Sequence, residues 1–483
     1  MPSESGSNPA RRKKVAKKKK KVVKKKKKKP PVKPSDNDLQ SSLDAAAAEP
    51  TISNDVGSPA TVPVVSEGTG EIIPPVPPAP PLAATNPTAA NGVDDVASKW
   101  APAARRQADK IVEVEDNFDY GVAFRMAFLG TGEAGGRMAE SFWNLGYRRL
   151  GVLNTTHADF ENIAPEITRL DLEVSGARKD ADYAARVMDG REEEVFELMT
   201  RTWGNEVDYA LICAGLGGGT GSGTLPVLVK LARQYLEEKG LPPRVGAVVS
   251  LPTMTEGQQV CRNAVNTFKK MLQLGVSPII IIDNNRIHQV YRPPMAQLYS
   301  TANQMVSEYF HLFNRLCEAP NAMMTFDRSE FAQILDSGVV VMGAAPVGDE
   351  TTISGPADIA KAIREQLTNN VLAEADLRTG HKSVCIFVAT ESILQSFDLE
   401  YFNAGFAQLN RVVGERVDAQ KTPPVLHRGL YEGGSNGISV YSMIGGLKPP
   451  EERLRMLARQ AGLIGQGVKG MSMAQFLGVD DAS

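Results

Sequence analysis

Two glycine-rich stretches are the clearest candidates for chemistry in this sequence. The first, AFLGTGEAGG at residues 127–136, places Gly130, Gly132 and Gly135 between an apolar run and a helix-like segment. The second, CAGLGGGTGSGTLPVL at residues 213–228, has five glycines between residues 217 and 223, with Thr220 and Ser222 among them. Without side chains the backbone can wrap a phosphate group with its N–H donors, and the positive end of the following helix adds to the attraction. Both stretches therefore predict phosphate-binding turns.

The first stretch by itself fits the glycine fingerprint of a nicotinamide dinucleotide site. Such a site requires an acidic residue at the end of the second strand, where it holds the ribose hydroxyls. Here the corresponding run, RRLGVLN, ends at Asn154 and continues with Thr155 and Thr156, and Asp159 comes later. The second stretch is not a Walker loop either, because no Gly-Lys-Ser/Thr follows it. A nicotinamide dehydrogenase is disfavoured, although tight binding of NAD in preference to GTP would revive that interpretation.

The elements that must position these loops are apolar runs and amphipathic segments that alternate along the chain. Short apolar runs recur after Gly121, and helix-length amphipathic segments separate them. This alternation predicts an α/β fold in which helices cover both faces of a mostly parallel sheet. Ligands of such sheets bind beyond the carboxyl ends of the strands, which is where both glycine stretches fall. The apolar runs are VAFRMAFLG, RRLGVLN, VDYALICAG, VGAVVSLP, SPIIIIDN and GVVVMGAA.

The sequence before this region has a different composition. Residues 11–29 are almost entirely Lys and Arg, and residues 30–104 are rich in Pro, Ala, Ser, Thr and Asn. Such a segment buries too little apolar surface to offset its ordering entropy, so residues 1–118 are predicted to be a disordered arm. A Lys-rich block without aromatic residues suits sequence-independent attraction to the phosphates of DNA or of an anionic membrane, and a solubilising tail is the alternative.

Other features point to a cytoplasmic protein without a transmembrane segment. No apolar run approaches the roughly 18 residues that a membrane-spanning helix needs. The Lys block is not followed by the apolar core of a signal peptide. The cysteines lie in apolar or mixed stretches without metal-ligand spacing, which predicts reduced core thiols and no metal-ligating side chains. These cysteines are Cys213, Cys261, Cys317 and Cys385.

The segment GGGTGSG at residues 217–223 resembles the signature loop of the tubulin/FtsZ GTPase superfamily. The resemblance extends in the same order over about residues 121–446: GTGEAGGRMAESFWNLG resembles the first phosphate loop and helix, and NTTHADF the second loop. It is greatest toward FtsZ-like proteins of bacterial cell division and the bacterial cytoskeleton. The resemblance implies a Rossmann-like parallel-sheet GTPase domain, a long central helix and a smaller α/β second domain. It also implies GTP, GDP and Mg²⁺ as ligands.

The same resemblance implies a nucleotide site. Glu256 matches a ribose contact, Asn284 the position that recognises the guanine edge, and Tyr299 would stack on the base. Asn303 would hydrogen-bond guanine, since an amide offers both a donor and an acceptor. The full set of implied nucleotide-binding residues is Gly132, Glu133, Ala134, Gly135, Asn154, Thr155, Gly217, Gly218, Gly219, Thr220, Gly221, Ser222, Glu256, Asn284, Tyr299 and Asn303. A third phosphate loop aligns with SGARKDAD, and the roles of Glu133 and Arg262 stay open.

The segment MMTFDRSEF at residues 323–331 is similar to the family loop that enters the nucleotide site of the next subunit. Asp327 and Glu330 match its two acidic positions and are implied to be catalytic, whereas Thr325 replaces its asparagine. A carboxylate can orient and deprotonate a water in line with the γ-phosphate. The implied protein is a polymerisation-dependent GTPase that turns over slowly if Thr325 is a poor substitute. A GTP-binding regulator that does not polymerise is the alternative.

The predicted organisation follows from these assignments. We expect a protein that polymerises head to tail, acting in cell division, DNA segregation or membrane organisation. The last segment, KGMSMAQFLGVDDAS, is either a partner-binding peptide or a frayed terminus. The predicted parts are the arm at 1–118, the GTP-binding domain at 119–294, the central helix at 295–320, the catalytic loop and last strand of the GTPase domain at 321–345, the second α/β domain at 346–446, and a C-terminal helix and tail at 447–483.

Overall fold

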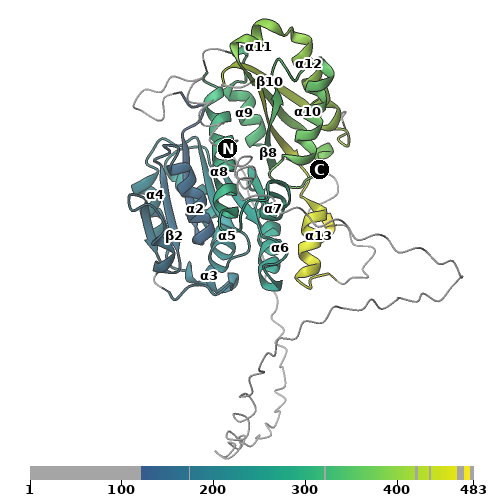
Figure 1. Ribbon diagram of the computed structural model, residues 1–483. Coiled ribbons are helices and arrows are strands. Elements are labelled where there is room, and N and C mark those ends of the chain that lie inside the picture. The colour runs from purple at the N-terminus through teal and green to yellow at the C-terminus, as the bar shows by residue number, and fades with distance from the viewer. Residues whose placement is uncertain are drawn as a thin grey trace, which may run out of the picture. The chain divides into compact units, whose positions relative to one another are not determined.

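The computed structural model describes residues 121–172, 174–319, 322–418, 423–434, 437–464 and 473–478. The predicted arm at residues 1–118 lies outside these ranges, as does much of the predicted tail. Within the described residues, eleven strands form a single sheet in the order β3-β2-β1-β4-β5-β6-β8-β11-β9-β10-β7 (Figure 1).

The first seven strands in this order run parallel to one another. Several of them are buried at every residue, as expected for apolar strands that helices cover on both faces. The parallel sheet predicted from the apolar runs is therefore confirmed. The strands are β1 (Met126–Thr131), β2 (Leu150–Asn154), β3 (Thr168–Asp171), β4 (Tyr209–Gly215), β5 (Val245–Leu251), β6 (Ile279–Asp283) and β8 (Val339–Gly348).

Amphipathic helices cover the two faces of this parallel part. One apolar cluster packs α4, α5 and α6 against the strands, and a second packs α2 and α8 against the opposite face. Each helix buries apolar residues that recur at helical spacing. The helices and 3-10 turn of this part are α2 (Gly132–Trp143), η2 (His157–Phe160), α3 (Ala181–Val187), α4 (Glu192–Thr202), α5 (Gly219–Glu238), α6 (Gln258–Gln273), α7 (Asn284–Tyr291) and α8 (Leu298–Leu316).

The long central helix is α8, which is confirmed at Leu298–Leu316 and is buried along most of its length. One of its buried polar residues has partners inside the protein: the Asn314 side chain accepts from the Phe124 backbone N–H (2.9 Å) and donates to the Phe124 carbonyl (3.0 Å). At 1.5 Å per residue, its 19 residues span about 28 Å. The helix thus connects regions of the molecule that lie far apart.

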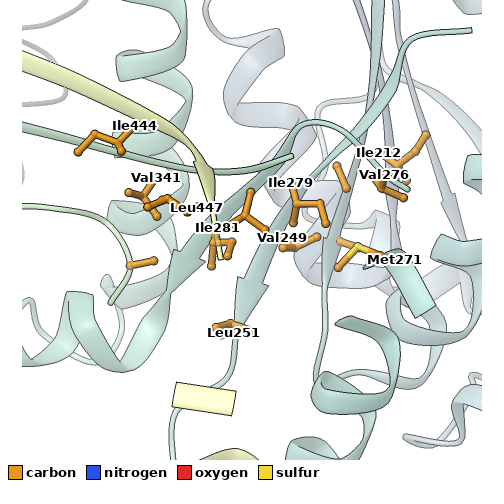
Figure 2. Close-up of a cluster of buried hydrophobic side chains, with 14 of the residues drawn as sticks. Ile212, Val249, Leu251, Met271, Val276, Ile279, Ile281, Val341, Ile444 and Leu447 are labelled. Atoms are coloured by element: carbon orange, nitrogen blue, oxygen red, sulfur yellow. The ribbon is translucent and has the colours of Figure 1, made fainter. Parts of the chain in front are cut away.

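The second α/β layer continues the same sheet. Strand β8 pairs antiparallel with β11 (Ile438–Leu447), which pairs with β9 (Lys382–Ala389), followed by β10 (Val425–Glu432) and β7 (Ala322–Met324). Figure 2 shows Ile444 and Leu447 of β11 near Val341 of β8 and Ile281 of β6, in one apolar cluster. The packed side chains are therefore continuous between the two α/β layers.

Shorter helices complete this second layer and the C-terminal region. Helices α10 and α12 pack against each other over the second layer, and α13 packs against α6 of the first. The elements are α9 (Arg328–Leu335), α10 (Pro356–Asn369), η3 (Leu377–Thr379), α11 (Glu391–Ser396), α12 (Leu399–Val412), α13 (Glu451–Gln460) and α14 (Met473–Leu477).

Candidate nucleotide-binding site

A cavity of about 460 Å³ opens at the carboxyl ends of the parallel strands. Most of the predicted nucleotide-binding residues line it, although they come from segments far apart in the sequence. The predicted residues that line the cavity are Gly132, Glu133, Ala134, Thr155, Gly217, Gly218, Gly219, Thr220, Gly221, Glu256, Asn284, Tyr299 and Asn303.

Three other predicted residues, Gly135, Asn154 and Ser222, are not among the cavity-lining residues. A Cβ atom at Gly135 would collide with the carbonyl of Cys213, so this glycine lets α2 pack closely on β4. The Asn154 side chain donates to Asp159 (2.8 Å) and accepts from the backbone N–H of the next residue (2.8 Å). The Ser222 hydroxyl donates to the Leu216 carbonyl (2.6 Å). All three stabilise the loops around the cavity.

The first glycine loop turns sharply where β1 meets α2. Gly132 has φ +68°, a left-handed conformation that favours glycine, and an added Cβ atom would lie 3.0 Å from the Gly221 nitrogen. The hydroxyls of Thr131 and Thr224 lie 2.6 Å apart and join the first loop to the helix that follows the second. The two glycine loops therefore form one continuous wall of the cavity.

The second glycine loop ends at the N-terminus of α5, with Gly218 as the N-cap residue. The first backbone N–H groups of a helix have no partner within the helix, and they carry the positive end of its dipole. An added Cβ atom at Gly218 would meet no protein atom within 4 Å, which places open space beside this backbone. The wall can therefore accept an anion such as a phosphate group.

Asn263 of α6 supports the second loop from behind and was not predicted from the sequence. Its buried side-chain amide donates to the carbonyls of Lys179 (2.9 Å), Gly217 (3.2 Å) and Gly218 (3.3 Å). With these carbonyls held away from the cavity, the N–H groups of the loop can face it. The available signal was an amide at a position that the spacing of the apolar residues assigns to the buried face of α6.

Both acidic and basic side chains line the cavity. The role of Glu133 was left open by the sequence. Arg137, one turn further along α2, donates to the Glu133 carboxylate (2.8 Å) and offsets its charge. Arg178 also lines the cavity and has no ion-pair partner among the described residues. It has φ +49°, and Lys179 after it has φ +63°, an uncommon conformation that costs free energy in residues other than glycine. The segment proposed as a third phosphate loop thus contributes a cation to the cavity.

The opposite wall carries the residues predicted to bind a base and a ribose. Asn284 begins α7, and Tyr299 and Asn303 lie one turn apart on α8. Both amides are buried, whereas Tyr299 is 44% exposed and presents its ring to the cavity. Partial burial and the nearby Glu256 carboxylate raise the pKa of Tyr299, so its phenol stays neutral. A neutral aromatic ring beside two amides can stack on a purine and hydrogen-bond its edge.

The predicted catalytic residues Asp327 and Glu330 form the start of α9. The Asp327 carboxylate accepts from the Glu330 backbone N–H (2.9 Å), and the Glu330 carboxylate accepts from the Asp327 N–H (3.1 Å). Ser329 donates a further bond to Asp327 (2.8 Å). These hydrogen bonds, the one from the Glu330 backbone first, lower the pKa of Asp327 and keep it ionised.

The segment at residues 323–331, called the acidic loop from here on, lies at the opposite edge of the parallel strands from the cavity. Arg328 donates to Asp208 (3.0 Å), which directly precedes β4, so α9 sits at the amino ends of the strands. The central helix begins at the cavity with Tyr299, and its far end contacts the loop through Phe313 and Phe326, whose ring centres lie 6.3 Å apart. Figure 1 shows α3, beside the second glycine loop, and α9 toward opposite ends of the strands.

Two side chains of β10 hold the acidic loop, and no sequence motif indicated either. Buried His427 places its Nδ1 atom 2.9 Å from the Glu330 carboxylate. The Tyr431 hydroxyl accepts from the backbone N–H of Phe326 (2.8 Å). The second layer therefore positions the loop.

The structure also places two features that the sequence left open. Arg262 donates to the Ala461 carbonyl (3.1 Å), so it contacts the C-terminal region and is not among the cavity-lining residues. In the last described segment, Leu477 is buried, and the Lys269 ammonium donates to the Phe476 carbonyl (2.8 Å). Residues 473–478 thus pack on α6.

Two further observations concern membranes and thiols. In the described part of the chain, no helix has both the length and the apolar character that crossing a membrane requires. The four cysteines are buried free thiols, as their apolar surroundings predicted.

A parallel α/β sheet with two glycine loops beside a cavity at one edge and an acidic loop at the other defines a protein of tubulin/FtsZ-like fold. Residues 125–292 match the model of the tubulin/FtsZ family, GTPase domain. This match over residues 125–292 confirms the resemblance inferred from the sequence.

Relatives and solved structures agree with this assignment. The chain is 22% identical to the tubulin-like protein TubZ of Bacillus cereus over 364 residues, 68% of this chain and 81% of TubZ. It is 21% identical to cell division protein FtsZ 2 of Pyrococcus furiosus over 313 residues, 61% of this chain and 72% of that protein. A GTPγS-form protofilament of TubZ from Bacillus thuringiensis serovar israelensis matches with a TM-score of 0.62 and 17% identity, over 76% of this chain and 96% of that one. This likeness confirms the predicted fold.

Proposed function

We propose that this protein binds GTP in the cavity and hydrolyses it as a head-to-tail polymer, with the acidic loop of one subunit completing the cavity of the next. The observation that carries this proposal is the position of the two halves of the site. The cavity lies at the carboxyl ends of the strands, and Asp327 lies at their amino ends. Members of the family are GTPases, and the TubZ structure similar to this chain is a protofilament.

The two opposite walls of the cavity suit the two parts of a guanine nucleotide. The glycine loops and the α5 N-terminus would hold the phosphates, and Arg178 would offset their charge. Asn284, Tyr299 and Asn303 would bind guanine on the opposite wall. In this arrangement the phosphates would lie where the acidic loop of the next subunit enters the cavity.

Mg²⁺ is expected to accompany the nucleotide and to offset the charge that develops on the phosphates. Glu133 and Asp159 line the cavity, but Arg137 pairs with the first and the Asn154 amide donates to the second. No cluster of three or more potential metal-ligating side chains occurs in the described ranges. Phosphate oxygens and water would therefore supply most ligands, which is usual for Mg²⁺.

Asp327 is better placed than Glu330 to orient the attacking water. Both carboxylate oxygens of Glu330 are engaged, one by the Asp327 N–H and the other by His427. In Asp327, one oxygen accepts the bonds from Ser329 and Glu330, and the other has no partner among the described residues. An ionised carboxylate with one free oxygen can accept a proton from water in line with the γ-phosphate.

Exposed apolar side chains at both edges support self-association. Met295 precedes the cavity-lining start of α8, and Met323 lies on β7 just before the acidic loop. Each is 63% exposed, and large exposed apolar side chains are suited to contact with another protein surface.

The Lys-rich segment at residues 11–29 is proposed to tether such filaments to DNA or to an anionic membrane, in DNA segregation, cell division or membrane organisation. Co-sedimentation of filaments with DNA or with vesicles, at low and high salt, would test this. Salt-sensitive binding that disappears when residues 1–34 are removed supports the tether, because counterion release dominates such contacts. Unchanged binding contradicts it.

GTP hydrolysis per subunit, measured against protein concentration with Mg²⁺ present, tests the main proposal. Wild type, Asp327→Ala and the exposed control Glu193→Ala on α4 would be compared. A rise above a threshold concentration in wild type and control, and its loss in Asp327→Ala, supports a site shared between subunits. Hydrolysis that is independent of concentration would contradict it.

A second candidate is a GTP-binding regulator that does not polymerise. The observation that favours it is exposed Thr325, which stands where the family has an asparagine in the acidic loop. GTP binding by a protein that stays monomeric at high concentration would support the regulator.

A further inference from the structure

The C-terminal helix α13 contributes a buried cation to the region behind the base-binding wall. Arg453, in the first turn of α13, is 1% exposed, and so is its partner Asp283 at the end of β6. The guanidinium makes two hydrogen bonds to the carboxylate, Nε to Oδ2 (2.8 Å) and Nη2 to Oδ1 (3.0 Å). Such a planar, bidentate pair fixes orientation as well as distance.

The same guanidinium also holds the loop after β5. It donates to the Pro252 carbonyl and lies 2.9 Å from the Met254 sulfur. Pro252 lines the cavity, and so does Glu256 further along this loop. One side chain of α13 therefore contacts two strand ends that build the cavity.

Asp283 connects Arg453 to the base-binding residues. It directly precedes Asn284, which lines the cavity, and its carboxylate accepts from the Asn285 backbone N–H (3.0 Å) to cap α7. Arg453 therefore holds the residue that caps α7. The other end of α13 is anchored too, because the Ala461 carbonyl accepts from Gln258 (3.2 Å) and Arg262 (3.1 Å), close after Glu256.

We propose that Arg453 is a positioning residue for the base and ribose half of the nucleotide, so that docking of α13 and occupancy of the cavity are coupled. This inference rests on the proposed function, because it concerns GTP in the same cavity. Displacing α13 would leave the Asp283 charge buried without its partner and free the loop at Pro252, which is unfavourable. Coupling of this kind is reciprocal: bound GTP would strengthen docking of α13 as much as docked α13 strengthens GTP binding.

The phosphate half of the cavity gives a way to separate positioning from general destabilisation. Arg453 contacts Pro252, Met254 and Asp283, whereas the glycine loops are held by other residues, among them Asn263. Loss of Arg453 should therefore weaken binding of a complete nucleotide and spare binding of a phosphate chain that has no base. A variant that simply destabilises the domain would weaken both.

The experiment compares GTP and tripolyphosphate binding by calorimetry in wild type, Arg453→Met, Arg453→Lys and the control Arg459→Met, an exposed residue of the same helix. We expect Arg453→Met to weaken GTP binding by about 5- to 150-fold, the usual range for coupled sites. Tripolyphosphate binding should stay within twofold, Arg453→Lys should lie between Arg453→Met and wild type, and Arg459→Met should match wild type.

Three results would overturn the inference. Equal GTP binding by wild type and Arg453→Met would leave the proposed function intact and remove the role of Arg453. Parallel loss of GTP and tripolyphosphate binding would show a purely structural role. Failure of wild type to bind GTP would instead overturn the proposed function together with this inference. If Arg453→Met does not fold, Arg453→Lys carries the same comparison, because it keeps the charge and lacks the bidentate geometry.

Discussion

His427 and Glu330 form a direct contact of 2.9 Å between β10 of the second layer and the acidic loop. This contact occupies one carboxylate oxygen of Glu330, and the Asp327 backbone occupies the other. The second layer therefore has a part in the proposed catalysis, because it fixes the loop that carries Asp327.

Replacing His427 should affect hydrolysis and spare nucleotide binding. In His427→Leu the Glu330 carboxylate loses one of its two partners, so we expect GTP turnover in the polymer to fall about 10- to 100-fold, as misplaced catalytic groups do. GTP affinity should stay unchanged because His427 does not line the cavity. Steady-state turnover and nucleotide titration measure the two quantities. His427→Gln, which keeps a donor, is the matched control, and equal loss in both variants would argue against positioning through this bond.

Asp327 should show its role through pH as well as through substitution. Its pKa is lowered in the folded protein, so its contribution to stability is present above the usual Asp value of about 3.9 and is lost as pH falls through the folded value. Asp327→Asn should therefore lower the melting temperature at pH 7 and lower it less at pH 3. Turnover should fall by about 10²- to 10⁴-fold, as expected when a general base is removed. An equal thermal shift at both pH values would contradict the ionic contribution.

Gly218 offers a test of phosphate binding that leaves the protein intact. Its backbone is extended and an added Cβ atom meets no protein atom, so Gly218→Ala should fold normally. If a phosphate lies against this backbone, the methyl group should weaken GTP binding about tenfold or more, since overpacking a close contact costs about 1–3 kcal/mol. Nucleotide titration and thermal melting would be compared. Unchanged affinity would place the phosphates elsewhere.

Gly219 is the control for that substitution. An added Cβ atom there would lie 2.7 Å from the Ala177 Cβ and 3.0 Å from the Asp180 nitrogen. Gly219→Ala should therefore lower the melting temperature as well as the affinity, because α5 must move away from the segment that precedes α3. The two neighbouring glycines thus distinguish a ligand contact from a packing contact.

The sequence predicted the parallel sheet and most of the cavity because those features depend on local signals. Apolar runs specify buried strands and glycine clusters specify turns. The family resemblance supplied Tyr299 and Asn303, which lie one turn apart on α8 and line the cavity. The family resemblance then placed Asp327 at a loop that the structure finds at the opposite edge. These predictions needed no knowledge of which distant segments meet.

Other parts of the site could not be predicted, because their roles arise only from tertiary contacts. Asn263, His427 and Arg453 lie in ordinary helix or strand patterns, and their partners are distant in the sequence. A buried polar side chain requires a partner, but its identity depends on packing. The same limit explains why the sequence left the role of Arg262 open, since its contact is with the Ala461 carbonyl at the end of α13.

Met323 provides a test of polymerisation at the edge that carries the acidic loop. It is 63% exposed on β7, close to Asp327 in the sequence, and would be covered by the next subunit in a head-to-tail polymer. Met323→Glu should raise the critical concentration for GTP-dependent sedimentation about tenfold or more, because burying an unpaired charge in an interface is costly. GTP binding by the dilute subunit should stay unchanged, since the cavity lies at the other edge. Leu399→Glu, at an exposed apolar residue of α12, is the control. Sedimentation that falls equally in both variants would mean that added charge, and not the position of Met323, weakens assembly.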